Sequence, residues 1–247
     1  MSLLSVTVRR KAFGDTLVLE DVEFDIEPGS FTALVGPSGA GKSTLLNIVS
    51  ALDGHFEGRL DWSPQARRRI GYMFQEPRLM PWLNACENIE LVLAGRAGAS
   101  DIALSMLERV GLAGREGSLP RELSGGMQRR IALARAMAIE PDLLLLDEPF
   151  SSLDEPTAQG LRRLSLHLCR EQGNAVLLVT HNLSEALSVA DRVLFLSRGP
   201  ARVVHRECLS HDDSAGARLR DPDPALRDLL ARHPDILSGV VTQEETS

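Results

Sequence analysis

The sequence contains almost no lysine. Of its 27 lysine and arginine residues only Lys11 and Lys42 are lysines, so arginine supplies nearly all of the positive charge. We interpret this bias as a preference for arginine codons in the source genome. Because lysine is so rare, Lys42, which stands inside a glycine-rich loop, is difficult to dismiss as background.

The chain also has little cysteine, no long apolar run and no excess of positive charge. Its three cysteines are far apart and lack metal-ligand spacing, which predicts reduced thiols. No apolar run approaches the ~18 residues of a membrane helix, and residues 1–13 lack a signal-peptide core. We therefore expect a cytosolic chain that meets a membrane only through a partner. The net charge of −7 argues against sequence-independent nucleic-acid binding, which needs a basic surface.

What the sequence does contain is an ordinary globular composition, with 43% hydrophobic and 25% charged residues. Aromatic residues make up only 4%, so aliphatic side chains must fill the core. Alternating or continuous apolar runs predict strands at residues 3–10, 17–27, 31–35, 58–62, 67–74, 143–149, 175–181 and 191–197, the last closing the sheet. Between the later strands lie helical patterns, and this alternation predicts a parallel α/β core.

The helical patterns cluster in one part of the chain. Residues 76–140 are mostly helical and interrupt the strand pattern, so we expect them to form an inserted subdomain. Residues 1–75 and 141–200 then form the α/β core of one domain that spans residues 1–247. The tail, 201–247, is expected to pack at the periphery.

A phosphate-binding loop stands between a predicted strand and a predicted helix. Glycines allow successive backbone N–H groups to point at phosphate oxygens, and the following helix adds its positive end. The lysine neutralises the β- and γ-phosphates, and the hydroxyl that follows it ligates Mg²⁺. The alternative is an ordinary glycine-rich turn. The loop comprises Gly36, Pro37, Ser38, Gly39, Ala40, Gly41, Lys42, Ser43 and Thr44.

Two carboxylates follow the leucine run 143–146. In an open α/β sheet, ligands bind at the carboxyl ends of the strands. Asp147 is thus placed to hold Mg²⁺, directly or through water, and Glu148 to orient and deprotonate an attacking water. Acidic residues also simply end strands, so the pair gains weight only from the phosphate loop upstream.

A second helix start has the features of an anion site. In the segment Leu123, Ser124, Gly125, Gly126 and Met127, the serine is a candidate N-cap and the glycines expose backbone donors at the positive end of the helix. The simpler interpretation is a capped helix with no ligand.

The order of these motifs resembles the ATP-binding subunit of an ABC transporter. The resemblance rests on "GPSGAGKST", a glutamine after "YMF", "LSGGMQRR", "LLLLDEP", "SSLD" and "VTH", and covers about residues 3–200. It implies a P-loop NTPase fold with a RecA-like parallel core, an N-terminal antiparallel β subdomain and a helical subdomain. It also implies ATP and Mg²⁺ as cofactors and ATP hydrolysis as the activity.

The resemblance assigns roles to four further residues. Phe13 matches the aromatic residue that stacks on adenine, although a phenylalanine at a strand end is often core. Gln75 matches the residue that meets Mg²⁺ and the attacking water. Asp154 matches the loop that crosses to the partner subunit, but it also suits a helix cap before Glu155. His181 matches the residue that contacts the γ-phosphate, although isolated histidines at strand ends are more often structural.

The resemblance also implies partners. Two copies of the chain sandwich two ATP molecules, and each phosphate loop faces the "LSGGM" segment of the other copy. The dimer drives an integral membrane permease from the cytoplasmic face of the membrane, and an extracytoplasmic solute-binding protein takes part indirectly. Small departures occur at Gln128 and Arg129, where the family usually has Arg-Gln, and at Ser152, where alanine is common. We expect these departures to leave the catalytic groups untouched.

The segment Leu79, Met80, Pro81 and Trp82 indicates a subtype. It resembles the importer branch that serves nitrate, taurine, aliphatic sulfonates and thiamine-precursor pyrimidines. These residues either dock a permease helix or fill the core of the helical subdomain. An exporter or lipid-handling ATPase stays open as an alternative. A non-transport ABC ATPase is a third possibility, but the chain has neither coiled-coil heptads nor a second phosphate loop.

Overall fold

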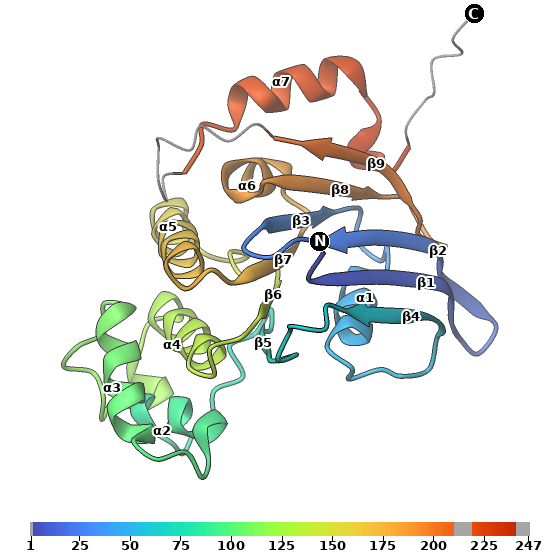
Figure 1. Cartoon of the computed structure of the whole chain (residues 1–247). Helices are drawn as coiled ribbons and strands as arrows, with labels where there is room; N and C mark the ends of the chain where they lie inside the picture. Colours follow the sequence, from blue (N-terminus) through green and yellow to red (C-terminus); the bar gives the residue numbers. More distant parts are fainter. Residues whose placement is uncertain (1, 210–218, 241–247) are drawn as a thin grey trace, which may run out of the picture.

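The computed structural model of the chain describes residues 2–209 and 219–240 and contains two β-sheets (Figure 1). The smaller sheet is antiparallel with strand order β2-β1-β4. Its strands are β1 (Leu4–Phe13), β2 (Thr16–Ile26) and β4 (Glu57–Trp62). The expected N-terminal antiparallel β subdomain is therefore present, and the predicted strand at 58–62 belongs to it.

The larger sheet has strand order β5-β6-β7-β3-β8-β9. Its first five members pair in parallel, as predicted. They are β5 (Ile70–Met73), β6 (Leu143–Asp147), β7 (Ala175–Thr180), β3 (Phe31–Val35) and β8 (Arg192–Leu196).

Both faces of the parallel sheet are buried. Along β6, Leu143 and Leu145 pack toward the antiparallel sheet and α1 (Lys42–Val49), while Leu144 and Leu146 pack into the core on the opposite face. Strands covered on both sides read as continuous apolar runs, which explains the pattern of 143–146. Aliphatic residues dominate both core layers, as the low aromatic content requires.

The described residues contain six α-helices besides α1. α2 (Ala85–Glu90), α3 (Ala99–Arg109) and α4 (Gly125–Met137) form the helical lobe beside β5 (Figure 1). α5 (Glu155–Gln172) and α6 (Leu183–Val189) follow β6 and β7, and α7 (Asp223–Arg232) comes near the C-terminus. Single 3₁₀ turns occur at Leu91–Leu93, Pro120–Glu122 and Ile236–Ser238. None of these described helices is both long and apolar enough to cross a membrane.

The structure corrects the expectation that residues 191–197 close the sheet. β9 (Val203–Cys208) pairs antiparallel with β8 and forms the edge beyond it. Charged and polar residues are common on edge strands, and here they hide the strand pattern. The tail is also less peripheral than expected, since Leu229 of α7 and Ile236 are buried in the main core. The rest of the tail, 210–218 and 241–247, lies outside the described residues.

Candidate functional site

The phosphate loop joins β3 to α1 at the carboxyl edge of the parallel sheet. Gly39 and Gly41 both have φ of +79°, a left-handed conformation that glycine adopts without strain. A Cβ on Gly41 would lie 2.8 Å from the side chains of Val18 and Leu19. The loop therefore needs glycine at Gly41 for both its backbone and its close packing.

Lys42 is buried at the first position of α1. Its Nζ donates to the carbonyl oxygens of Gly36 and Pro37, each at 2.9 Å. Burial lowers the pKa of the Lys42 ammonium, and the carboxylates of Asp147 and Glu148 oppose that shift. The ammonium is thus held within the phosphate loop itself, close to two negative groups.

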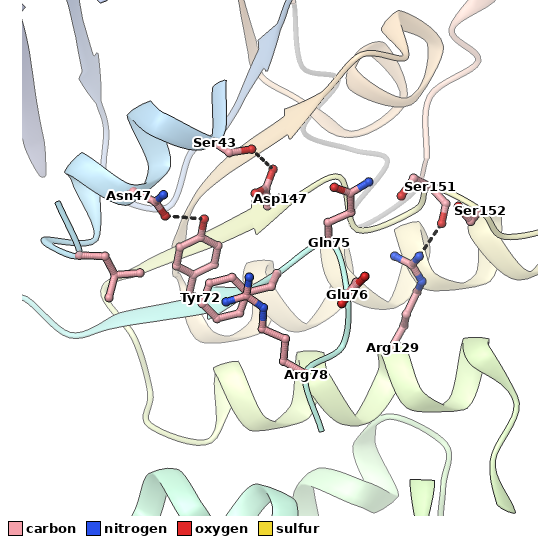
Figure 2. A pocket seen from close by; sticks show the side chains of 12 residues that line it. Ser43, Asn47, Tyr72, Gln75, Glu76, Arg78, Arg129, Asp147, Ser151 and Ser152 are labelled. Atoms are coloured by element: carbon pink, nitrogen blue, oxygen red, sulfur yellow. Dashed lines mark hydrogen bonds between the residues drawn. The ribbon is translucent and has the colours of Figure 1, made fainter. Parts of the chain in front are cut away.

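Asp147 ends β6 beside this loop. Its Oδ1 accepts a hydrogen bond from Ser43 Oγ at 3.2 Å, as Figure 2 shows. Burial raises the pKa of the Asp147 carboxyl, and the neighbouring charge of Glu148 acts in the same direction. The side chain is therefore a desolvated carboxylate that would gain from a cation.

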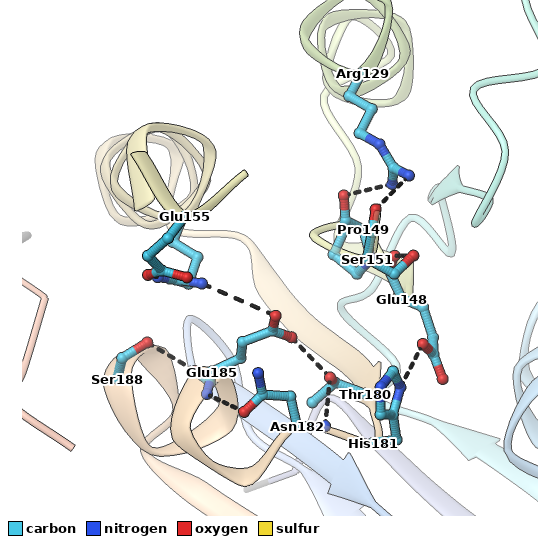
Figure 3. A network of polar contacts seen from close by, with 11 residues as sticks. Arg129, Glu148, Pro149, Ser151, Glu155, Thr180, His181, Asn182, Glu185 and Ser188 are labelled. Carbon is cyan, nitrogen blue, oxygen red and sulfur yellow. Dashed lines mark hydrogen bonds and ion pairs between the residues drawn. The ribbon is translucent and has the colours of Figure 1, made fainter. Parts of the chain in front are cut away.

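Glu148 and His181 come from adjacent strands and meet across the cleft. Glu148 follows β6, His181 follows β7, and His181 Nδ1 lies 2.7 Å from Glu148 Oε2 (Figure 3). Glu148 has φ of +43°, a left-handed conformation that is uncommon for a residue other than glycine. The Glu148 amide also donates to the carbonyl of Val179 at 2.9 Å, which fixes this strained turn against β7.

Two clefts meet at Ser43 and Gln75, which line both of them. One has a volume of about 520 Å³ and includes Lys42, Glu148 and His181. The other, about 740 Å³, includes Asp147 and is shown in Figure 2. Motifs that are more than 100 residues apart in the chain thus face one continuous site, as the topology predicts.

The larger cleft contains an aromatic pair that sequence reasoning missed. Tyr72 and Phe74 stack with their ring centroids 4.0 Å apart, and the Arg78 guanidinium lies 4.0 Å from the centre of the Phe74 ring. Tyr72 also donates a long hydrogen bond to Asn47 at 3.4 Å (Figure 2). Their alternation along β5 and beyond it looks like ordinary strand packing.

Phe13 is not a core residue. Its side chain is 54% exposed at the end of β1, and Lys11 Nζ lies 4.4 Å from the ring centroid. The alternative of a packed strand-end phenylalanine is therefore wrong. The Lys11 ammonium lies over one face of the Phe13 ring, and about half of the side chain is open to solvent.

The segment Leu123–Met127 lies outside both of these clefts, as the described lining residues show. Ser124 caps α4 as predicted, with its Oγ accepting from the Met127 amide at 3.3 Å. Asp154 caps α5 by accepting from the Thr157 amide at 3.2 Å, so the helix-cap interpretation is correct. The two caps are neighbours, because a Cβ on Gly126 would lie 2.6 Å from the Thr157 side chain.

Two arginines of α4 hold the loops that carry site residues. Arg129 donates to the carbonyls of Pro149 and Ser151 at 2.7 and 2.6 Å, directly after Glu148. Arg135 donates to the carbonyls of Pro77 and Arg78 at 2.8 and 2.9 Å, directly after Gln75. Arg129 touches no catalytic side chain, as expected, but it fixes the backbone beside one. In the sequence, this role of Arg129 is indicated only by its position one helical turn after Gly126.

The Leu79–Trp82 segment has one end packed against the core and one end exposed to solvent. Leu79 packs against the core, whereas Trp82 is 72% exposed. The fully buried Asn88 bonds both the amide and the carbonyl of Met80, and it also donates to the carbonyl of Leu83 at 2.9 Å. The turn that presents Trp82 is therefore rigidly held from within the helical lobe.

Known proteins are similar to this chain in sequence and in fold. The family described as ABC transporter matches residues 19–151. "Aliphatic sulfonates import ATP-binding protein SsuB 1" of Frankia alni is 48% identical over 230 residues, which are 92% of this chain and 82% of that protein. "Aliphatic sulfonates import ATP-binding protein SsuB 2" of Burkholderia cenocepacia is 46% identical over 205 residues, 81% of this chain and 76% of that protein.

A solved structure agrees with the fold. It is a dimeric, post-hydrolysis state of the ATP-binding cassette MJ0796 bound to ADP and Pi, with a TM-score of 0.72, 30% identity, and coverage of 84% of this chain and 99% of that one. The family match, the relatives and the fold all agree with the family resemblance that the motif order indicated. The chain belongs to the ABC transporter family, as one of its ATP-binding, ATP-hydrolysing subunits.

Proposed function

We propose that this chain binds Mg·ATP at its phosphate loop and hydrolyses it to drive import of an organic sulfonate through a separate permease. The observation that carries the proposal is the convergence of Lys42, Glu148, His181 and Gln75 on one cleft. These residues come from four separate parts of the chain and supply the charges that phosphoryl transfer needs.

The phosphate loop, from Gly36 to Thr44, holds the phosphates of ATP. Lys42 exchanges its bonds to the Gly36 and Pro37 carbonyls for bonds to β- and γ-phosphate oxygens. Burial of the ammonium makes that exchange favourable, since a buried cation gains strongly from an anionic partner. The exposed Phe13 ring stacks on the adenine.

Ser43 and Asp147 fit Mg²⁺, and Gln75 stands at the junction of the two clefts beside them. The hydroxyl and the carboxylate lie 3.2 Å apart, and Mg²⁺ typically takes one or two protein oxygens besides phosphates and waters. The described residues contain no cluster of three His, Cys, Asp or Glu that could hold a metal without substrate. The ion would neutralise charge that develops on the phosphates.

Glu148 is the general base for the attacking water, and His181 contacts the γ-phosphate. The 2.7 Å contact between these two side chains supports this pairing, since each fixes the other at the cleft. The backbone of Glu148 is left-handed, and its side chain lines the same cleft as Lys42.

Each site is completed by a second copy of the chain. The capped, glycine-rich start of α4 at Leu123–Met127 lies outside its own clefts and offers backbone donors at a helix start. In an ATP-sandwich dimer this segment closes the partner's nucleotide site, and the loop at Asp154 crosses the same interface. The MJ0796 cassette is itself dimeric in its post-hydrolysis state, which supports this arrangement.

The permease docks at the helical lobe, beside the Gln75 hinge. Trp82 is exposed on a turn that Asn88 holds rigidly, and tryptophan is a frequent anchor in interfaces. The subunit then lies peripherally on the cytoplasmic face of the membrane. An extracytoplasmic solute-binding protein takes part indirectly.

The solute class follows from the relatives, whose names state aliphatic sulfonate import. Uptake of radiolabelled alkanesulfonate, taurine, nitrate and a thiamine-precursor pyrimidine tests it in cells that carry the wild-type chain or Glu148→Gln. We expect Glu148-dependent uptake of the alkanesulfonate, of taurine, which is also a sulfonate, or of both, and no uptake of nitrate or the pyrimidine. Uptake of nitrate or the pyrimidine alone would replace the sulfonate assignment, and no Glu148-dependent uptake of any solute would contradict the import role.

A further inference from the structure

A buried polar network lies behind His181, on the side away from Glu148 (Figure 3). At its centre is Glu185 in the first turn of α6, whose side chain is only 13% exposed. Thr180 Oγ1 donates to Glu185 Oε2 at 2.8 Å, and the Asn182 amide donates to Thr180 Oγ1 at 3.0 Å. Thr180 is thus bonded directly to the Glu185 carboxylate, and Asn182 is connected to it through the Thr180 hydroxyl.

A second tie fixes the same turn from the helix side. Asn182 caps α6, and its side chain accepts from the Glu185 amide at 3.3 Å. Glu185 therefore bonds to the flanks of His181 through its carboxylate and through its own backbone. Little freedom is left in the turn that carries the imidazole.

The carboxylate is anchored to a different helix. Arg162 of α5 places Nη1 3.9 Å from Glu185 Oε1 and also pairs with Glu155 in the first turn of α5. The guanidinium is 8% exposed and lies 5.8 Å from the centre of the Phe150 ring. This links the turn at His181 to the helix that follows the proposed dimer loop.

The network is difficult to explain by stability alone. Burial raises the pKa of the Glu185 carboxyl, which the hydrogen bond from Thr180 and the positive charge of Arg162 only partly offset. The Arg162 Nε has no hydrogen-bond partner among the described residues. Buried ion pairs often stabilise a fold no better than apolar residues of the same size, but a bonded network fixes one geometry.

We propose that Glu185, held by Thr180 and Arg162, is a positioning residue that keeps the His181 imidazole against Glu148. Glu185 lines neither of the two described clefts, and its hydrogen bonds reach the residues on both sides of His181. The inference rests on the proposed function, in which His181 and Glu148 serve ATP hydrolysis.

The test combines turnover with the NMR signal of one imidazole. Thr180→Val keeps the side-chain shape but removes the hydroxyl, and Glu185→Gln keeps the acceptor but removes the charge that faces Arg162. Thr180→Ser restores the hydroxyl. Ser188→Ala is the matched control, because the Ser188 hydroxyl donates to the Glu185 backbone carbonyl at 2.7 Å without reaching the turn.

In the assembled transporter, we expect Thr180→Val and Glu185→Gln to lower kcat at least about tenfold while KM for ATP stays within about twofold. Thr180→Ser and Ser188→Ala should stay near wild type. In the purified subunit, the ring nitrogen resonances of His181, assigned among the six histidines by their loss in His181→Ala, should move in the first two variants toward their positions in Glu148→Ala.

Unmoved His181 resonances in Thr180→Val and Glu185→Gln would overturn the inference, whatever the activity. A general loss of thermal stability with shifts of all histidines would also overturn it, since that indicates a merely structural network. If the resonances move as expected but kcat does not fall, the positioning role holds and the proposed role of His181 in hydrolysis fails.

Discussion

At the scale of single residues, the site concentrates charges that are unfavourable without substrate. Asp147 and Glu148 lie side by side, and burial raises the pKa of the former. Lys42 lies buried between backbone carbonyls with its pKa lowered. In the proposed function each group gains when Mg·ATP supplies the opposite charge, so binding of substrate and relief of desolvation coincide.

Glu148 carries the most direct residue-scale prediction. Glu148→Gln keeps the shape and the contact distance to His181 but removes the base. We expect ATP affinity to stay within a fewfold, while turnover falls by about 10²–10⁴, the usual contribution of a positioned base. Turnover and nucleotide affinity are measured on the assembled transporter. Turnover within about twofold of wild type would reject Glu148 as the base.

The motif residues could be predicted from sequence because their positions depend on local rules. Asp147 ends one buried strand, Glu148 follows that strand and His181 follows the next, and parallel strands bring their carboxyl ends to one edge. Arg129 and Glu185 could not be predicted, because their partners lie on other elements and neither spacing nor periodicity encodes such contacts. Sequence reasoning thus found the groups that line the clefts but not those that hold them in place.

At the scale of elements, α4 connects the helical lobe to two loops of the site. It starts at the glycine-rich segment, and Arg129 and Arg135 fix the backbone after Glu148 and after Gln75. A shift of the helical lobe on binding a partner therefore reaches both loops. Through these contacts of α4, binding of the proposed permease partner can change the positions of both site loops.

Trp82→Ala tests the docking surface on this lobe. Because Trp82 is 72% exposed, its truncation should change the melting temperature of the isolated subunit little and leave ATP affinity unchanged. The binding free energy between subunit and permease should weaken by about 2 kcal/mol or more, which is the usual contribution of an interface anchor. Less permease should therefore co-purify with the variant. Leu104→Ala, another exposed apolar residue of the lobe, is the control and should have no effect. A drop in stability of several kcal/mol with docking intact would show instead that Trp82 supports the core.

The α7–β9 contact predicts a pH dependence. Burial raises the pKa of Glu207, but bonds from Arg232 at 2.9 Å and His205 at 3.0 Å outweigh it, so the folded pKa lies below the unfolded value of 4.5. Such a group stabilises the fold above the unfolded pKa, and its contribution is lost as pH falls through the folded pKa.

Glu207→Gln should therefore lower stability by about 1 kcal/mol or less near neutral pH and by nothing at strongly acidic pH. Thermal melts of both proteins across this range measure the difference. Asp228→Asn, which removes the exposed partner of Arg232, is the control and should have a smaller effect. If Glu207→Gln lowers stability equally at neutral and at strongly acidic pH, the assignment is contradicted.

At the scale of the whole molecule, the architecture could be predicted where long patterns repeat. Strand–helix alternation indicated the parallel core, and the proline-broken helical stretch from 76 to 140 indicated the lobe. The edge strand β9 could not be predicted, since its residues between Val203 and Cys208 alternate poorly and carry charge. Tertiary pairing with β8, rather than local propensity, makes it a strand.

The whole-molecule claim is that each ATP site needs two chains. The phosphate loop and the segment Leu123–Met127 lie in different parts of one chain, and the latter lines neither described cleft. Lys42→Ala should abolish ATP binding at a site's own loop, and Ser124→Arg should block the partner's site. The loss of the Ser124 cap costs about 1 kcal/mol, so folding of that variant is checked by its melt.

Mixing these two variants gives the most direct measurement. A heterodimer of Lys42→Ala and Ser124→Arg contains one site with both defects and one with neither. If the sites are shared between chains, each variant alone is inactive, and mixing restores up to about half of the wild-type ATPase activity per heterodimer. If heterodimers form and no activity returns, the account of shared and independently working sites is contradicted.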